Sequence, residues 1–415
     1  QVQKFALMCI YRAETRNRTS IAQFNVKDIN FTLCTHYLYA YGCVNSFKLL
    51  CAASPELEEG PTGYFRMFND VKKINPSTKT LLSIGGPSLK VYQAFTSMSD
   101  AEIYIFAKSA LLFLRHRDFD GLDIDLSFPH WYHHKSTLDK TLQLLRREFD
   151  KDTVKPCLLL TLTASGLESD IQAIYNVESI KDYVDYVLVK SYNLYLPQMS
   201  YTHFNSPLYT RRSQPEHYML NMNFSIHFWS SLGMPFDKLV VGLTGVGRFL
   251  QAPITNTILR GSYYKIPSGL AYPEVCLMKD TSQIYFDDVQ KCPYLVRQDT
   301  WVGYDDVRSI QEKLSWMTKL HVAGVMFAGL DEDDFTGTLC QDGKYPLLNY
   351  IKAHIQNIST TLRPSTQAPQ DHRQENNDLR YTKNFIIFVV CCLLAGLAVG
   401  LAVLYLLKQL GYIKK

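Results

Sequence analysis

The stretch "FDGLDIDLSFP", residues 119–129, has the pattern of a buried β-strand that carries acids along one face. Successive side chains of a strand point to opposite sides, so Asp123, Asp125 and Ser127 form one row. Buried carboxylates destabilise a fold unless they are paired or hydrogen-bonded, and such a row usually marks a site. Because this row ends in a serine, the stretch indicates a catalytic strand or one that has lost its last acid.

Seven other short apolar runs are typical of strands: "FALMCIY" (5–11), "THYLYAY" (35–41), "KTLLSIGG" (79–86), "CLLLTLTA" (157–164), "YVDYVLVKSY" (183–192), "KLVVGLTG" (238–245) and "VAGVMFAGL" (322–330). Amphipathic stretches such as "DAEIYIFAKSALLFLRHR" (100–117) and "LDKTLQLLRREFDK" (138–151) lie between most of them. Strands that alternate with helices in this way predict an α/β fold, a (β/α)8 TIM barrel. Such a barrel takes about 250 residues. The surplus falls mainly between the seventh and eighth strands, where we predict an inserted α+β subdomain at about 246–310.

The composition is that of a globular protein with a large core: of 415 residues, 47% are hydrophobic and 20% are charged, and the net charge is +4. No basic run accompanies this small positive charge, which argues against a nucleic-acid partner. His130 and His134 are four positions apart and could share a helical face as zinc ligands. No acid or cysteine lies at a matching spacing, so we predict a polar loop there, and neither a metal nor a cofactor.

One segment is not globular. "FIIFVVCCLLAGLAVGLAVLYLL", residues 385–407, is an uncharged apolar run long enough to cross a bilayer as a transmembrane helix. The residues before it, 357–384, are poor in apolar side chains and rich in Ser, Thr, Pro, Gln and Asn, which is the composition of a flexible stalk. The sequence thus predicts an ectodomain at 1–356 on a membrane tether, followed by a cytoplasmic tail at 408–415.

The orientation of the chain follows from modification sites, because the positive charges that flank the apolar run are evenly matched. The N-x-S/T sequons for glycosylation all precede that run, at Asn17, Asn30, Asn223 and Asn357. Eight of the ten cysteines precede it too, an even number that is compatible with disulfides. We therefore expect a single-pass type I glycoprotein of the plasma membrane with an extracellular ectodomain.

Several further segments carry a resemblance to a known family: "LCTHYLYAY" (33–41), "LLSIGG" (81–86), "HFNSPLY" (203–209), "WVGYDDVRSI" (301–310) and "LDEDDFTGTLCQDGKYPLL" (330–348). In their order and spacing, and together with residues 119–129, they resemble glycoside hydrolase family 18, the chitinases and chitinase-like lectins. The resemblance implies a TIM barrel with an α+β insertion. It also implies two disulfides, Cys9–Cys34 and Cys276–Cys340. Cys43 and Cys51 could close a local loop, and the pairing of Cys157 and Cys292 stays open.

The resemblance also implies a mechanism against which this chain can be compared. In family 18 the last acid of a DxxDxDxE strand protonates the glycosidic oxygen, and the acetamido group of the substrate is the nucleophile. This chain keeps Asp120, Asp123 and Asp125 but has Ser127 at the position of the acid. A hydroxyl is no general acid near neutral pH, and loss of such a group typically lowers a rate by roughly 10²–10⁴. We therefore predict that the chain is not an enzyme.

Other positions of the implied cleft are altered as well. The family's M-T-Y-D reads "KSYN" (190–193), its Y-G-R reads "VGR" (246–248), and its cleft-floor tryptophan falls at Ala328. After the strand of residues 119–129 comes a loop, "HWYHHK" (130–135), whose aromatic residues are typical interface contacts. The side chains that we predict to bind a ligand are Tyr192, Asn193, Arg248, Trp301, Lys190 and Trp131.

These features favour one function and leave two alternatives. We expect a membrane-anchored pseudoenzyme that binds a protein or a glycan at the carboxyl end of the barrel. The first alternative is a residual chito-oligosaccharide lectin that uses Tyr192, Arg248 and Trp301 without hydrolysis. The second, less favoured because of Ser127, is an active chitin hydrolase.

Overall fold

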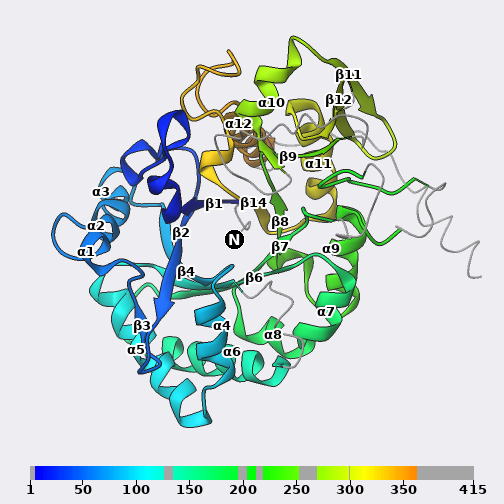
Figure 1. Ribbon diagram of the computed structural model, residues 1–415. Helices are drawn as coiled ribbons and strands as arrows, with labels where there is room; N and C mark the ends of the chain where they lie inside the picture. The colour runs from blue at the N-terminus through cyan, green and yellow to red at the C-terminus, as the bar shows by residue number, and fades with distance from the viewer. Residues whose placement is uncertain are drawn as a thin grey trace, which may run out of the picture. The chain divides into compact units, whose positions relative to one another are not determined.

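Eight parallel strands close into a barrel, as the apolar runs predict (Figure 1). The computed structural model describes residues 5–125, 134–194, 203–211, 218–251, 269–298 and 300–361. The barrel strands, in chain order, are β1 (Ala6–Arg12), β2 (His36–Val44), β4 (Lys79–Gly85), β5 (Gly121–Asp125), β6 (Leu159–Ser165), β7 (Tyr186–Lys190), β8 (Leu239–Leu243) and β14 (Gly324–Phe327). Strand β1 pairs in parallel with both β14 and β2, and this pairing closes the ring.

Helices follow the barrel strands and cover the barrel from outside (Figure 1). They are α1 (Pro55–Glu58), α2 (Tyr64–Asn69), α3 (Val71–Ile74), α4 (Leu89–Thr96), α5 (Asp100–His116), α6 (Lys135–Lys151), α7 (Glu168–Ile174), α8 (Val177–Tyr183), α9 (Met222–Ser231), α11 (Val307–Leu320) and α12 (Pro346–Thr361). Helix α5 begins at a capping box, in which Ser99 and Glu102 bond each other's backbone N–H groups. Both amphipathic stretches singled out in the sequence are thus confirmed as long helices, α5 and α6.

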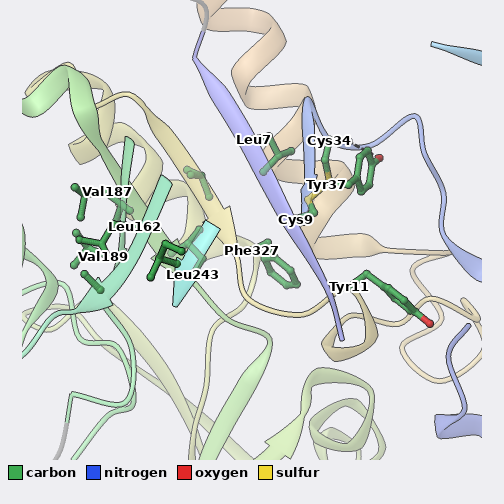
Figure 2. Packing of buried hydrophobic residues seen from close by; sticks show 14 of the residues in the cluster. Leu7, Cys9, Tyr11, Cys34, Tyr37, Leu162, Val187, Val189, Leu243 and Phe327 are labelled. Atoms are coloured by element: carbon green, nitrogen blue, oxygen red, sulfur yellow. Dashed lines mark hydrogen bonds between the residues drawn. A yellow bond between two sulfur atoms is a disulfide. The ribbon is translucent and has the colours of Figure 1, made fainter. Parts of the chain in front are cut away.

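The alternation of side chains along each strand divides the apolar core into two clusters. On β1, Leu7, Cys9 and Tyr11 belong to a large cluster between the barrel and its helices, part of which Figure 2 shows. The intervening residues Met8 and Ile10 belong to a smaller cluster inside the barrel. The inside row of each strand therefore points into the barrel, and the last residues of these rows lie at its carboxyl end, where sites are built in this fold.

A second sheet lies between β8 and α11 in the chain, in the region where the sequence predicts an inserted subdomain. It has five strands in the order β10-β9-β13-β12-β11. Its elements are β9 (Val246–Gln251), β10 (Gly269–Ala271), α10 (Tyr272–Lys279), β11 (Gln283–Asp287), β12 (Cys292–Arg297) and β13 (Thr300–Gly303). All strand pairs in it are antiparallel, because short connections such as that from β11 to β12 reverse the chain.

The disulfides agree with the expectation. Cys9–Cys34 and Cys276–Cys340 are both formed. The local loop is closed by Cys43–Cys51, which joins the end of β2 to the short strand β3 (Leu50–Cys51). Of the remaining cysteines that the structure describes, Cys157 is exposed and Cys292 is buried, and neither is bonded to another cysteine.

The described part of the chain lies within one compact unit, residues 1–362. Helix α12 continues to Thr361, so regular structure extends past residue 356, where the sequence analysis places the end of the ectodomain. Ile351 and Ile355, one turn apart, are both buried in the large apolar cluster and attach this part of the helix to the core. Among the residues described, no helix is long and apolar enough to span a bilayer. The predicted span, 385–407, lies outside them.

Candidate functional site

The strand quoted first places its carboxylates at different heights of the barrel. Asp120 directly precedes β5 and lies at the amino end, where its Oδ2 accepts a hydrogen bond of 2.9 Å from the backbone N–H of Thr80. Lys72 and Lys79 approach the same carboxylate at 3.1 Å and 3.4 Å. Asp120 thus joins β5 to β4 at the end of the barrel opposite to the expected cleft, which fits a structural role.

Asp123 lies inside the barrel and binds hydroxyl groups of both neighbouring strands. Its oxygens accept hydrogen bonds from Ser83 of β4 at 2.6 Å, and from Thr161 and Thr163 of β6 at 2.7 Å and 3.0 Å. Burial, together with the nearby charge of Asp125, raises the pKa of Asp123 to about 7, although the hydroxyl donors act in the opposite direction. Asp123 is therefore a buried bridge across three strands and has the means to hold a proton near neutral pH.

Asp125, the last residue of β5, forms an ion pair with a residue of the same chain. Nζ of Lys190, the last residue of β7, lies 2.8 Å from Oδ1 and 2.9 Å from Oδ2 of Asp125. The hydroxyl of Tyr41 donates to the same Oδ2 at 2.9 Å. The Asp125 side chain is only 2% exposed, whereas that of Lys190 is 24% exposed. A cation of the chain itself thus engages both oxygens of the carboxylate at the mouth of the barrel.

A second group of ion pairs lies at the ends of β1 and β14. Arg12, the last residue of β1, donates to Asp331 through Nη2 at 2.6 Å and lies 3.0 Å from Glu332. Arg18 adds a contact of 2.7 Å to Asp331. A Cβ on Gly329 would lie 2.9 Å from both Arg12 Nη2 and Glu332 Cδ, so only glycine leaves room for this network.

The acids of this second network differ in charge state. Burial raises the pKa of Glu332 to about 7, although Arg12 acts against it. Burial would also raise the pKa of Asp331, but Arg12 and Arg18 outweigh it and hold that pKa below its ordinary value. Glu332 is further bonded by the hydroxyl of Thr244 at 2.6 Å. The network therefore has two guanidinium groups around one firmly ionised acid and one that titrates near neutrality.

Tyr192 lies at the base of the mouth, close to both ion-paired groups. Its ring packs on Gly242 of β8, where a Cβ would be 2.9 Å from Cε1 of the tyrosine. Burial, and then the charges of Glu332 and Asp125, raise the pKa of Tyr192 well above its ordinary value. Asn193, by contrast, is exposed, and its backbone N–H donates to Asn205 Oδ1 at 3.0 Å. The structure thus brings Lys190, Asp125 and Tyr192 together and leaves the Asn193 side chain at the surface.

Arg248 and Trp301 lie on the second sheet rather than on the barrel. Arg248 of β9 is 5% exposed and donates to the backbone carbonyl of His203 at 3.3 Å. It pairs across the sheet with Gly303, and the indole of Trp301 lies over that glycine, 2.4 Å from where a Cβ would be. The ring of Phe204 is 5.4 Å from the indole. Arg248 and Trp301 are therefore neighbours on one face of this sheet.

Three residues that the sequence analysis singled out, Ser127, His130 and Trp131, lie outside the described residues. His134 directly precedes α6, and its ring packs edge-on against Tyr92 at 5.8 Å. In the part of the chain that the structure describes, no group of His, Cys, Asp and Glu is arranged to hold a metal ion.

The predicted glycosylation sites differ in exposure. Asn17, Asn30 and Asn357 are exposed, as carriers of a glycan need to be. Asn223 is half-buried in the first turn of α9, and its Oδ1 accepts a hydrogen bond from the indole of Trp316 at 3.1 Å. A glycan at Asn223 would have to be accommodated beside that contact.

Sequence reasoning missed several residues of the mouth: Tyr41, Arg12, Arg18, Asp331 and Glu332. One signal for Arg12 was present, because it continues the inward row of Met8 and Ile10 and so lies at the carboxyl end of a barrel strand. A charged residue at that position is a site candidate in this fold.

Comparison with known proteins gives one family. The family model described as glycosyl hydrolases family 18 matches residues 7–333. Chitotriosidase-1 of Mus musculus is 31% identical over 382 residues, which cover 87% of this chain and 80% of that protein. Chitinase-3-like protein 2 of Homo sapiens is 29% identical over 373 residues, which cover 85% of this chain and 93% of that protein. The oviduct-specific glycoprotein of Papio anubis is 31% identical over 377 residues, which cover 86% of this chain and 59% of that protein.

Solved structures give the same result. Human YKL-39, described as a pseudo-chitinase with retained chitooligosaccharide binding properties, matches with a TM-score of 0.78 at 28% identity, over 85% of this chain and 100% of that one. The Group IV chitinase of Ostrinia furnacalis in complex with allosamidin matches with a TM-score of 0.77 at 30% identity, over 85% of this chain and 99% of that one. The similar structures thus include a chitinase and a pseudo-chitinase.

Proposed function

The chain belongs to glycosyl hydrolase family 18, and we propose that it is a chitinase-like pseudoenzyme of the plasma membrane, which binds a protein or a glycan without hydrolysis. In this proposal the barrel is an extracellular binding domain, carried by the stalk and the apolar segment at 385–407. Its ligand contacts the carboxyl end of the barrel and the neighbouring face of the second sheet.

The observation that carries the proposal is the ion pair between Lys190 and Asp125. The family resemblance implies that the inner aspartates of the motif hold the acetamido group of the substrate, but here both oxygens of Asp125 are within 2.9 Å of Lys190 Nζ. An acetamido group would have to displace a charge-assisted contact that is largely shielded from water, and such contacts are stronger than neutral hydrogen bonds. The arrangement therefore opposes substrate-assisted catalysis independently of Ser127.

The second ion-pair network supports the same conclusion. Arg12 and Glu332 lie close to Gly329, which directly follows Ala328, the position where the family's cleft-floor tryptophan falls. Sugar rings bind such clefts on aromatic faces. Here, charged side chains that are paired with each other stand near that position, and they offer hydrogen bonds rather than a stacking surface.

A second candidate function, a chito-oligosaccharide lectin, has an observation of its own. Tyr192 is retained at the base of the mouth, and Arg248 lies beside Trp301 on the second sheet. YKL-39, which matches over 85% of this chain, is a pseudo-chitinase that retains chitooligosaccharide binding. A glycan could thus bind along the second sheet without using Asp125.

One set of variants distinguishes these functions. Turnover of a fluorogenic chito-oligosaccharide and calorimetric titration with N-acetylglucosamine oligomers should be measured for the wild type, Ser127→Glu, Lys190→Met and Lys79→Met. Lys79→Met is a matched control, because Lys79 also pairs with an aspartate of the quoted strand but at the opposite end of the barrel.

We expect no turnover by the wild type or by Ser127→Glu, because Lys190 still holds Asp125. Lys190→Met should strengthen oligomer binding at least tenfold, whereas Lys79→Met should not change it. Turnover by the wild type would refute the proposal. Micromolar binding by the wild type that Trp301→Ala abolishes, without turnover, would favour the lectin.

A further inference from the structure

Strand β11 is the last strand of the second sheet and pairs on one side only, with β12. Among the described residues no strand pairs with its other side. Edge strands of soluble proteins are usually protected by lysine, proline, a bulge or a covering segment, because their free N–H and C=O groups pair readily with another strand. The sequence of β11, "QIYFD", contains neither lysine nor proline, and Ile284 and Tyr285 are 51% and 44% exposed.

A row of stacked aromatic rings leads across the sheet to this edge. Tyr285 of β11 lies directly opposite Tyr294 of β12, with ring centroids 5.1 Å apart and planes at 19°. Tyr294 in turn stacks on Trp301 of β13, at 6.1 Å and 30°. Among the rings described, the row ends at Tyr285, so the strand edge and the end of the aromatic row coincide.

We propose that β11 pairs with β11 of a second copy of the chain, antiparallel and about a two-fold axis that passes beside Tyr285. Tyr285 is the central residue of the strand, so such an axis places each Tyr285 opposite its counterpart. The two five-stranded sheets then become one continuous sheet, and the aromatic rows of the two copies join end to end. This interface is isologous, which is the commonest symmetry of homodimers.

The side chains of β11 are complementary to their own reversed order. About the proposed axis Ile284 faces Phe286 of the other copy, and Gln283 faces Asp287. The first contact joins two apolar groups and is favourable, and the second places an uncharged amide beside the end of the strand. No like charges face each other, since Asp287 is the only charged residue of the strand and already binds Arg211 at 2.7 Å.

This self-complementarity is the reason to choose a second copy over an unrelated peptide. Leu277 and Val289 of the same subdomain are also exposed, at 53% and 48%. A peptide of another protein would match the pattern only by carrying the same order of residues.

Cross-linking tests the register of the pairing. Residues directly opposite on antiparallel strands have Cβ atoms about 4.5–5.5 Å apart, close enough for a disulfide after small adjustments. In purified full-length protein with Cys157→Ser, Tyr285→Cys should therefore give a disulfide-linked dimer on mild oxidation, with the 285–285 link identified by mass spectrometry. Gln283→Cys is the control, since the two copies of residue 283 would be about 13 Å apart along the strands.

Self-association of the full chain without cross-links is the second measurement, by analytical ultracentrifugation in detergent. Ile284→Lys should weaken it at least tenfold without lowering the melting temperature, because Ile284 is exposed. Leu112→Lys is the matched control, since Leu112 is 70% exposed on α5 and should have no effect. The proposal is overturned if the wild type stays monomeric at all concentrations, if Gln283→Cys cross-links as readily as Tyr285→Cys, or if Tyr285→Cys links only to a different protein.

Discussion

Replacing Lys190 by methionine should destabilise the protein through the carboxylate that it leaves behind. Asp125 is 2% exposed, and in Lys190→Met its charge loses the cation that contacts both of its oxygens. Breaking a buried ion pair by removing one partner costs about 3–5 kcal/mol. Because the Lys190 side chain is 24% exposed, water screens part of the interaction, and we expect a loss near the lower end, about 3 kcal/mol.

The assay is urea unfolding of the purified wild type, Lys190→Met, Asp125→Asn and the double variant at pH 7. The double variant has neither charge, so it should recover most of the stability that Lys190→Met loses.

Two results would refute this reasoning. The first is a loss below about 0.5 kcal/mol in Lys190→Met, which would mean that the pair is effectively solvated, as surface pairs are. The second is additivity of the two single changes, because groups in direct contact must show a coupling energy in a double-mutant cycle.

The structure gives three further predictions. First, Asp123 should contribute a fall in the free energy of unfolding as the pH rises from about 4 to 7, because its pKa is raised to about 7 in the folded state. In Asp123→Asn this contribution is lost, so the slope of the free energy of unfolding against pH should be more positive than in the wild type by up to about 1.4 kcal/mol per pH unit. Identical slopes in urea titrations would contradict this. Second, Arg12→Met should lower the free energy of unfolding by roughly 3 kcal/mol, because Glu332 and Asp331 lose a shared cation. The double variant Arg12→Met/Glu332→Gln should recover part of that loss in urea unfolding. Third, removing the disulfide Cys276–Cys340, which closes a loop of 64 residues, should lower the free energy of unfolding by about 4 kcal/mol. Removing Cys43–Cys51, which closes a loop of 8, should lower it by about 2.5 kcal/mol. Thermal unfolding of the two double Cys→Ser variants checks this order, and the reverse order would count against the loop-entropy argument.

The barrel could be predicted because its strands are short apolar runs at regular intervals, and each of the eight forms a strand. The site was less accessible to sequence reasoning. Lys190 could be recognised as unusual at its position, but its partner could not, because contact between β5 and β7 depends on how strands two places apart align around the barrel.

Tyr41 was missed for a local reason. Tyr39 and Tyr41 are two residues apart on β2 and should point to the same side, and Tyr39 does pack in the outer cluster. The pairing of β2 with β4 shifts in register between Ala40 and Gly42, and beyond that irregularity Tyr41 reaches Asp125 inside the barrel. A single irregular residue reverses the side that period-two alternation predicts.

The bonds of Asp123 bear on how such chains are recognised in genomes. Its carboxylate ties three adjacent strands together through hydroxyl groups, a task that exists whether or not the barrel cleaves anything. A search that scores the first three aspartates of the strand motif therefore detects a well-built barrel, not an enzyme. The third aspartate carries separate information, because here Lys190, the last residue of the sixth barrel strand, contacts both of its oxygens.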